Sequence, residues 1–142
     1  MVVIERAAKA LIRRRSDGKY LMLTCSNWPE NLRRSQKPDL PGGVIEAHEH
    51  IEEGLLREIR EEVGITPIPG TVQLGRCFTY LYDGVSSNFL VYVAEVEGDE
   101  EIVLSWEHES YTWLTAQEIL SLDLRRPYPE LFHYLSDIGL MR

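Results

Sequence analysis

The segment from Leu40 to Ile65, LPGGVIEAHEHIEEGLLREIREEVGI, constrains the fold more than any other part of the chain. Its large apolar residues recur every four positions, as on one face of an amphipathic helix: Ile51, Leu55, Ile59 and Val63. Gly64 is a typical helix terminator, and the prolines soon after it cannot continue a helix. The segment therefore predicts a helix that buries one face and ends near Val63.

The same helix carries three glutamates, Glu58, Glu61 and Glu62, at positions that are neighbours on a helix surface. Like charges at this spacing repel each other by roughly 0.2–0.5 kcal/mol per pair. A hard cation such as Mg²⁺ binds carboxylate oxygens and would remove the repulsion. The cluster therefore predicts a metal site, and its structural alternative is a solvated helix face rich in glutamate.

Strand patterns lie on both sides of this helix. Before it, the turn signal Ser16-Asp17-Gly18 separates the N-terminal stretch to Arg15 from the apolar run YLML, as in a hairpin. The polar segment NWPENLRRSQKPD that follows is interpreted as a loop. After the helix we expect a strand over residues 71–82, a turn over 83–87 and a strand over 88–96.

The last third of the chain predicts a further strand over residues 110–114, a short helix from Ala116 to about Leu122, and a helix over residues 127–141. No repeat, low-complexity tract or linker divides the sequence. The order of strands, helix, strands and helices predicts one α/β (α+β) layered domain.

Charge and composition exclude some classes of function. The 15 Lys and Arg against 23 Asp and Glu give a net charge of −8, which repels duplex nucleic acid. A small polyphosphate would also be repelled unless a cation intervened. No apolar run reaches membrane length, and Glu5, Arg6 and Lys9 interrupt the N-terminal region where a signal peptide is apolar. We therefore expect a cytoplasmic protein with no membrane contact.

Nine positions fit the pattern G-x5-E-x7-R-E-U-x-E-E-x-G-U, where U is a bulky aliphatic residue: Gly43, Glu49, Arg57, Glu58, Ile59, Glu61, Glu62, Gly64 and Ile65. This pattern resembles the signature of the Nudix hydrolases. The segments DGKYLML, DLPGG and EHESYTWLTAQEI also resemble parts of that family, so the likeness spans most of the chain. The resemblance implies a single Nudix hydrolase domain over residues 1–142, a layered sandwich with a mixed β-sheet flanked by helices.

The resemblance also implies roles for individual residues. The ligands of Mg²⁺, for which Mn²⁺ could substitute, would be the Gly42 carbonyl and the carboxylates of Glu58, Glu61 and Glu62. Gly43 would allow a tight turn close to the site. Glu49 and Arg57 would form a supporting pair that holds the loop against the helix.

Enzymes of this family hydrolyse a nucleoside diphosphate linked to another group X, with a metal-activated water as nucleophile. X is left open between nucleoside triphosphates, nucleotide sugars and dinucleoside polyphosphates, and a short chain slightly favours a triphosphate or other small nucleotide. Glu107 is the preferred water-activating carboxylate, with Glu58 and Glu109 as alternatives.

Contacts to the substrate are predicted from side-chain chemistry. Arg33 and Arg34 could bind phosphates, and Tyr80 could stack on a base; a solvated basic loop and ordinary core packing are the alternatives. The competing function is a catalytically silent Nudix-fold module that binds a nucleotide or docks a partner protein. Many relatives dimerise, so a homodimer is left open.

Overall fold

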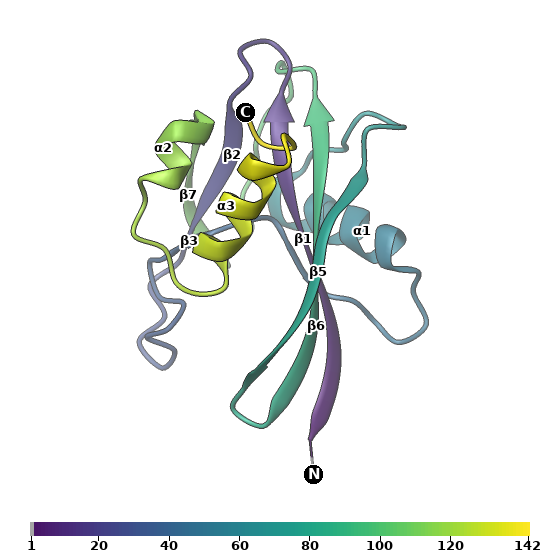
Figure 1. Cartoon of the computed structure of the whole chain (residues 1–142), viewed down its shortest axis with the longest axis vertical. Coiled ribbons are helices and arrows are strands. Elements are labelled where there is room, and N and C mark those ends of the chain that lie inside the picture. The colour runs from purple at the N-terminus through teal and green to yellow at the C-terminus, as the bar shows by residue number, and fades with distance from the viewer. Residues whose placement is uncertain (1) are drawn as a thin grey trace.

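The computed structural model describes residues 2–142 (Figure 1). Its elements in chain order are β1 (Val3–Arg14), β2 (Tyr20–Cys25), β3 (Pro38–Asp39), β4 (Gly42–Val44), α1 (Ile51–Val63), β5 (Gln73–Tyr82), β6 (Val85–Val96), β7 (His108–Leu114), α2 (Ala116–Leu120) and α3 (Tyr128–Asp137). The layered α+β arrangement of a mixed sheet flanked by helices confirms the predicted fold class.

The sheet is built around β1. This strand runs parallel to β6 along its whole length, and β6 pairs with β5 as an antiparallel hairpin. On its other side, β1 pairs with β2 at Arg13 and Tyr20, whereas β4 lies beside β1 over Ala7 to Lys9. β2 pairs instead with β3 and β7, so the sheet opens between its two halves.

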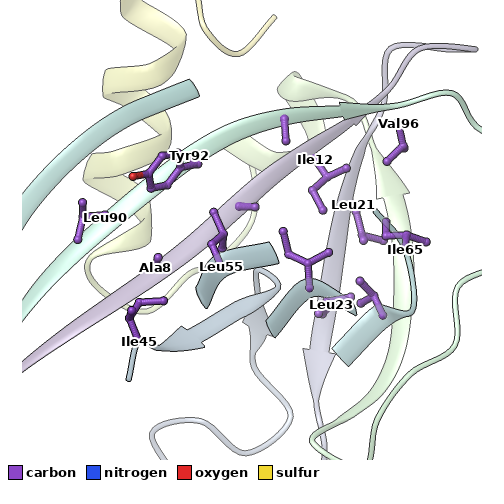
Figure 2. Close-up of a cluster of buried hydrophobic side chains, with 14 residues drawn as sticks. Ala8, Ile12, Leu21, Leu23, Ile45, Leu55, Ile65, Leu90, Tyr92 and Val96 are labelled. Carbon is purple, nitrogen blue, oxygen red and sulfur yellow. The ribbon is translucent and has the colours of Figure 1, made fainter. Parts of the chain in front are cut away.

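Alternation along the strands divides the core between two faces. On one face, α1 packs Leu55 and Ile59 against β1 residues such as Ala8 and Ile12 (Figure 2). On the other face, α2 and α3 cover a second cluster that includes Leu11, and Figure 1 shows α1 and α3 on opposite sides of the sheet. Burying one leucine or isoleucine stabilises the fold by roughly 1.5–3 kcal/mol, so these contacts stabilise the packing of helices on both faces of the sheet.

The predicted helix over Ile51–Val63 is confirmed, and Gly64 ends it in the left-handed conformation at φ 74°. The predicted five-residue turn over 83–87 is wrong, because β6 already begins at Val85. Asp83 and Gly84 both have positive φ, 44° and 77°, which is what a two-residue hairpin turn requires. The strands consequently pair up to the turn itself, at Tyr82 and Val85.

Other boundaries also differ. The predicted loop ends in the short strand β3, because Pro38 and Asp39 pair with β2. Strand β7 begins at His108, two residues early, and α2 and α3 are shorter than expected because Ser121 and Ile138 end them. Within residues 2–142 the structure has no helix with the length and apolar character needed to cross a membrane.

Candidate active site

A cavity of about 600 Å³ lies between the β1–β6–β5 part of the sheet, the loop before β3 and the segment that leads into α3. This volume is in the range of small-molecule sites. One end of it is lined by the predicted metal ligands Gly42, Glu58 and Glu62, together with the supporting Gly43 and with Glu107. Residues of α1 and of the segment just before β7 therefore line the same cavity, where the sheet opens between β1 and β2.

Glu62 is buried on the core side of α1, with 3% of its surface exposed. Its Oε2 accepts a hydrogen bond from the backbone N–H of Gly42 at 2.9 Å. Burial raises the pKa of Glu62 to about 8, although Lys9 and the Gly42 N–H oppose the shift. Burial likewise raises the pKa of Glu58, against the opposing charge of Arg57. A cation bound in the same cavity would lower the pKa of both acids and stabilise their ionised forms.

The adjacent glycines Gly42 and Gly43 have different reasons to be glycine. Gly42 adopts φ +132°, and a Cβ there would lie 2.1 Å from the Ala8 carbonyl oxygen. Gly43 was predicted to supply the tight turn, and in the structure the left-handed conformation belongs to Gly42 instead. A Cβ on Gly43 would lie 3.1 Å from the carboxyl of Glu58, so its absence leaves room for that carboxylate.

Arg57 connects three of the four acidic residues of the motif. Its Nε and one terminal nitrogen donate to the two carboxylate oxygens of Glu49 at 2.7 and 2.8 Å, a two-bond pair between the loop and α1. The bonds to Arg57 lower the pKa of Glu49 to about 2. The other terminal nitrogen donates to Glu58 at 3.2 Å and Glu61 at 3.1 Å. Glu61 is 59% exposed at its side chain and lies outside the cavity lining.

The two acids of the WEHESYTWL segment are placed differently. Glu107 lines the cavity, and its charge contributes to the raised pKa of Glu62. Glu109 is exposed and does not line the cavity. Between them, His108 is buried and directs its ring toward the interior. The backbone N–H of Ser26 donates to the Glu107 carbonyl at 2.9 Å, which ties this segment to the loop before β3.

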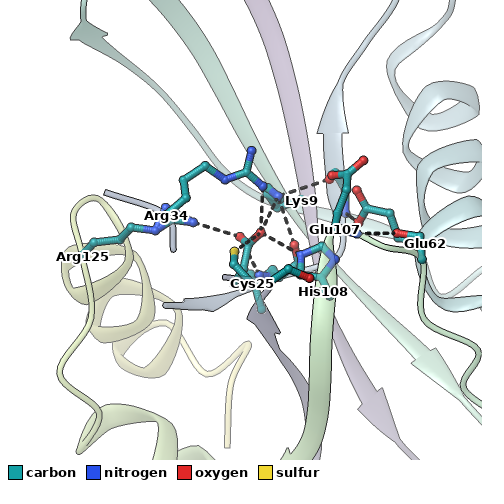
Figure 3. A network of polar contacts seen from close by, with 12 residues as sticks. Lys9, Cys25, Arg34, Glu62, Glu107, His108 and Arg125 are labelled. Atoms are coloured by element: carbon teal, nitrogen blue, oxygen red, sulfur yellow. Dashed lines mark hydrogen bonds and ion pairs between the residues drawn. The ribbon is translucent and has the colours of Figure 1, made fainter. Parts of the chain in front are cut away.

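Beside the acidic end lies a charged group that sequence reasoning missed, centred on the fully buried Asp39 (Figure 3). Its partners and distances are Lys9 at 3.2 Å, His108 at 3.1 Å, Arg125 at 3.2 Å, Arg34 at 3.7 Å and the Tyr128 hydroxyl at 2.6 Å. Burial alone would raise the pKa of Asp39, but Lys9, His108 and Arg125 outweigh it and hold the pKa well below its usual range.

A sequence signal existed for part of this group. Lys9 interrupts the apolar run AAKALI of β1, and a charge inside a buried strand needs a partner. Nothing in the local pattern indicates Arg125, which lies 86 residues from Asp39. Lys9 also donates to the carbonyl of Gly42 at 3.2 Å, so the predicted metal-ligand carbonyl already accepts one hydrogen bond.

Two groups of side chains could be considered as metal sites. Ligand atoms of Cys25, Asp39 and His108 lie within 4.8 Å of one another. Both oxygens of Asp39 are already bonded to cationic side chains, so this group does not suit a divalent cation. By contrast, Glu62 and Glu107 have no ion-pair partner among residues 2–142. Their oxygen-only donors suit Mg²⁺.

The predicted substrate-contact residues Arg33, Arg34 and Tyr80 all line the cavity. The Arg33 guanidinium lies over the Tyr82 ring at 4.7 Å, and that of Arg34 lies over Trp28 at 5.0 Å. Tyr80 stacks on Tyr82 with 5.5 Å between ring centroids. The structure therefore brings the basic loop, the aromatic strand and the acidic helix to one hollow.

The chain is similar to known proteins in sequence and in structure. The family model described as NUDIX domain matches residues 4–135. Nucleoside triphosphatase NudI of Escherichia coli (strain E24377A) is 32% identical over 94 residues, which are 60% of this chain and 66% of the relative; the chain thus spans slightly less than two thirds of that protein.

Solved structures give a likeness over nearly the whole chain. The MutT protein from Methanosarcina mazei Go1 has a TM-score of 0.83 at 28% identity, covering 97% of this chain and 96% of that one. The E. coli ORF135 protein has a TM-score of 0.79 at 21% identity, covering 97% and 92%. The second likeness concerns the fold alone.

Proposed function

Because the chain belongs to the Nudix hydrolase family, we propose that it is a divalent-metal-dependent pyrophosphohydrolase acting on a nucleoside diphosphate linked to a group X. The observation that carries this proposal is the meeting of Glu58, Glu62 and Glu107 in one cavity with basic side chains. A nucleoside triphosphate or another small nucleotide is the favoured substrate, in keeping with the name of the NudI relative.

The proposed ligands of Mg²⁺, for which Mn²⁺ could substitute, are Glu58, Glu61, Glu62 and the Gly42 carbonyl. Glu58 and Glu62 already face the cavity, whereas Glu61 must leave Arg57 to join them. The Gly42 carbonyl keeps a lone pair beyond the one that Lys9 uses. The cation, when bound, supplies neutralisation of the diphosphate charge and a lowered pKa of water.

The remaining steps fall to the side chains of the cavity. Glu107 is proposed to accept the proton of the attacking water, with Glu58 and then Glu109 as the alternatives. Arg34 holds the phosphate oxygens, because guanidinium groups bind phosphate through paired N–H donors, and Arg33 contacts the substrate from its place over the Tyr82 ring. The Glu49–Arg57 pair holds the loop before α1 against the helix. This fixes the position of the metal-binding glutamates relative to the phosphorus that is attacked.

The test is hydrolysis of a panel of nucleoside triphosphates, nucleotide sugars and dinucleoside polyphosphates, with Mg²⁺ or with chelator. Release of a nucleoside monophosphate only with Mg²⁺ is the expected result. Glu62→Gln should lower kcat by about 100-fold or more, which is the usual effect of removing one preorganised electrostatic group from a catalytic site. The matched control is Glu52→Gln, the same change at an exposed position of the same helix, and it should leave kcat unchanged.

Thermal unfolding with and without Mg²⁺ separates the alternatives. A native-state metal site raises Tm, and Glu62→Gln should remove that shift. Hydrolysis that survived Glu62→Gln would overturn the metal assignment. Binding of nucleotides without turnover of any of them would instead favour the catalytically silent binding module.

A further inference from the structure

The end of the cavity away from the glutamate helix is formed by one row of side chains across three strands. Glu5 on β1 is the register partner of Ser87 on β6, and Ser87 is the register partner of Tyr80 on β5. Directly opposed residues place their side chains on the same face of a sheet. All three residues line the cavity, so the row forms a continuous strip of its wall.

Ser87 is the unusual member of this row. It is 0% exposed, and its hydroxyl has no hydrogen-bond partner within residues 2–142. Buried polar groups are nearly always paired, because an unmade hydrogen bond destabilises the folded state. An unpaired hydroxyl in a cavity wall is therefore available to a ligand that enters the cavity.

Glu5 is oriented by its neighbour Tyr82, whose hydroxyl donates a hydrogen bond to Oε1 of Glu5. Burial and the bond to Glu5 raise the pKa of Tyr82 to about 12, so the phenol keeps its proton and remains the donor. The other carboxylate oxygen of Glu5 has no partner among the described residues. The carboxylate thus presents acceptors, and no donor, to the cavity.

A flat surface completes this end. Tyr80 and Tyr82 are stacked at 28° between ring planes, and Phe89 lies edge-on to Tyr80 with 5.7 Å between centroids. The Arg33 guanidinium covers the Tyr82 ring from the loop side. Aromatic and guanidinium planes of this kind are surfaces on which nucleobases stack.

The spacing suits a nucleotide. Glu5 and Lys9 are four residues apart on β1, which is roughly 13 Å along an extended strand. Lys9 bonds the Gly42 carbonyl, next to Glu62. The row of Glu5, Ser87 and Tyr80 therefore lies about one nucleoside away from the end of the cavity where the diphosphate would be hydrolysed.

We propose that Glu5, Ser87 and Tyr80 form a nucleobase subsite that selects a ring with two adjacent N–H donors, as guanine has at N1 and its 2-amino group. This inference rests on the proposed function for the placement of the diphosphate. A carboxylate meets such an edge with two hydrogen bonds. Adenine and cytosine place an acceptor nitrogen beside their amino group, and uracil places carbonyls beside its N–H, so each of them sets an acceptor against Glu5. The Ser87 hydroxyl donates a hydrogen bond to one of the acceptor atoms of the ring, such as O6 of guanine.

The test measures binding without turnover, by calorimetric titration of GMP, IMP, AMP, CMP and UMP in chelator. GMP should bind most tightly, and IMP, which lacks only the 2-amino group, more weakly. Glu5→Gln should weaken GMP by roughly 5- to 150-fold, the value of a two-bond contact to a base, and reduce its advantage over AMP. Pterins carry the same donor pair, so neopterin is added as a ligand, and the tighter binder of the two identifies the ring.

Two further variants guard against an indirect effect. Ser87→Ala should weaken GMP about two- to tenfold while its Tm stays the same or rises, because the change removes an unpaired buried hydroxyl. Glu30→Gln removes a charge from the exposed rim of the same cavity, and it should leave the ratio of GMP to AMP affinity unchanged.

Equal affinities for the five monophosphates, no binding of any of them at millimolar concentration, or an unchanged GMP affinity in Glu5→Gln would each overturn the subsite. These results are independent of hydrolysis. Glu5-dependent binding of GMP by a protein that hydrolyses no nucleotide would leave the subsite standing and remove the proposed function. Hydrolysis whose rate depends neither on Glu5 nor on the base would keep the proposed function and overturn the subsite.

Discussion

The backbone N–H of Gly42 donates to Oε2 of Glu62 at 2.9 Å, so the turn after β3 is joined directly to the buried side of α1. Gly42→Ala should destabilise the protein by at least about 3 kcal/mol. The variant combines φ +132° with a Cβ only 2.1 Å from the Ala8 carbonyl oxygen, and backbone atoms cannot move aside cheaply. Urea unfolding measures the change.

Gly70→Ala is the matched control for that prediction. Gly70 also has a positive φ, +84°, but no atom lies within 4 Å of its added Cβ. The control should lose only about 1–2 kcal/mol, the cost of the left-handed conformation alone. Equal losses in the two variants would show that the contact with Ala8 does not matter.

Arg57→Lys should lower kcat about 10- to 100-fold through loss of positioning, with only a small change in the free energy of unfolding. Lysine carries one point charge and cannot make the two parallel bonds that Arg57 makes to Glu49. Steady-state kinetics and urea unfolding are measured together. Arg60→Lys, at an exposed position of the same helix, is the control, and an equal fall in its kcat would contradict the role of the pair.

Asp39→Asn should destabilise the protein by roughly 3–5 kcal/mol, because Lys9 and Arg125 would lose a buried charge partner. The pH dependence has a definite sign. The folded pKa of Asp39 is depressed, so its stabilisation is present above the usual pKa near 4 and is lost as the pH falls below it. Unfolding at pH 2–7 should show a steeper acid loss in the wild type than in Asp39→Asn.

Asp17→Asn controls for the effect of removing any aspartate. Asp17 forms an exposed pair with Arg14 at 2.6 Å, and surface pairs contribute little. Its loss should be much smaller than that of Asp39→Asn. A wild type and an Asp39→Asn variant with parallel acid profiles would refute the linkage.

Glu107→Gln should lower kcat by about 10²- to 10⁴-fold at saturating Mg²⁺, the range for loss of a general base. Glu109→Gln, two residues away and exposed outside the cavity, should have little effect. The pair of variants is compared in one hydrolysis assay. A larger loss of kcat in Glu109→Gln than in Glu107→Gln would make Glu109 the general base. Wild-type rates in both variants would assign the general base to Glu58.

The local sequence pattern is sufficient to predict those elements whose hydrogen bonds join residues close together in the chain. Helix α1 follows from a four-residue apolar repeat and a terminal glycine, and the same periodicity places Glu58 and Glu62 together. The sequence predicts too long a turn between β5 and β6, because Asp83-Gly84 alone is a complete hairpin turn and the polar residues Ser86 and Ser87 already belong to β6. Strand residues that line a cavity need not be apolar.

The Nudix motif is visible in the chain as a pattern of residues, and its helix with the acids that it carries can be predicted locally, because helical hydrogen bonds join residues only four apart. Which distant residues lie beside these acids depends on how the strands pair in the folded protein. Asp39 lies 30 residues from Lys9 and 86 from Arg125, and Glu5 meets Ser87 through the pairing of β1 with β6. The period-two pattern of a strand indicates which of its faces is buried, but it does not indicate which strand is its neighbour. The cavity and the charged residues that line it therefore cannot be predicted before the strand pairing is known.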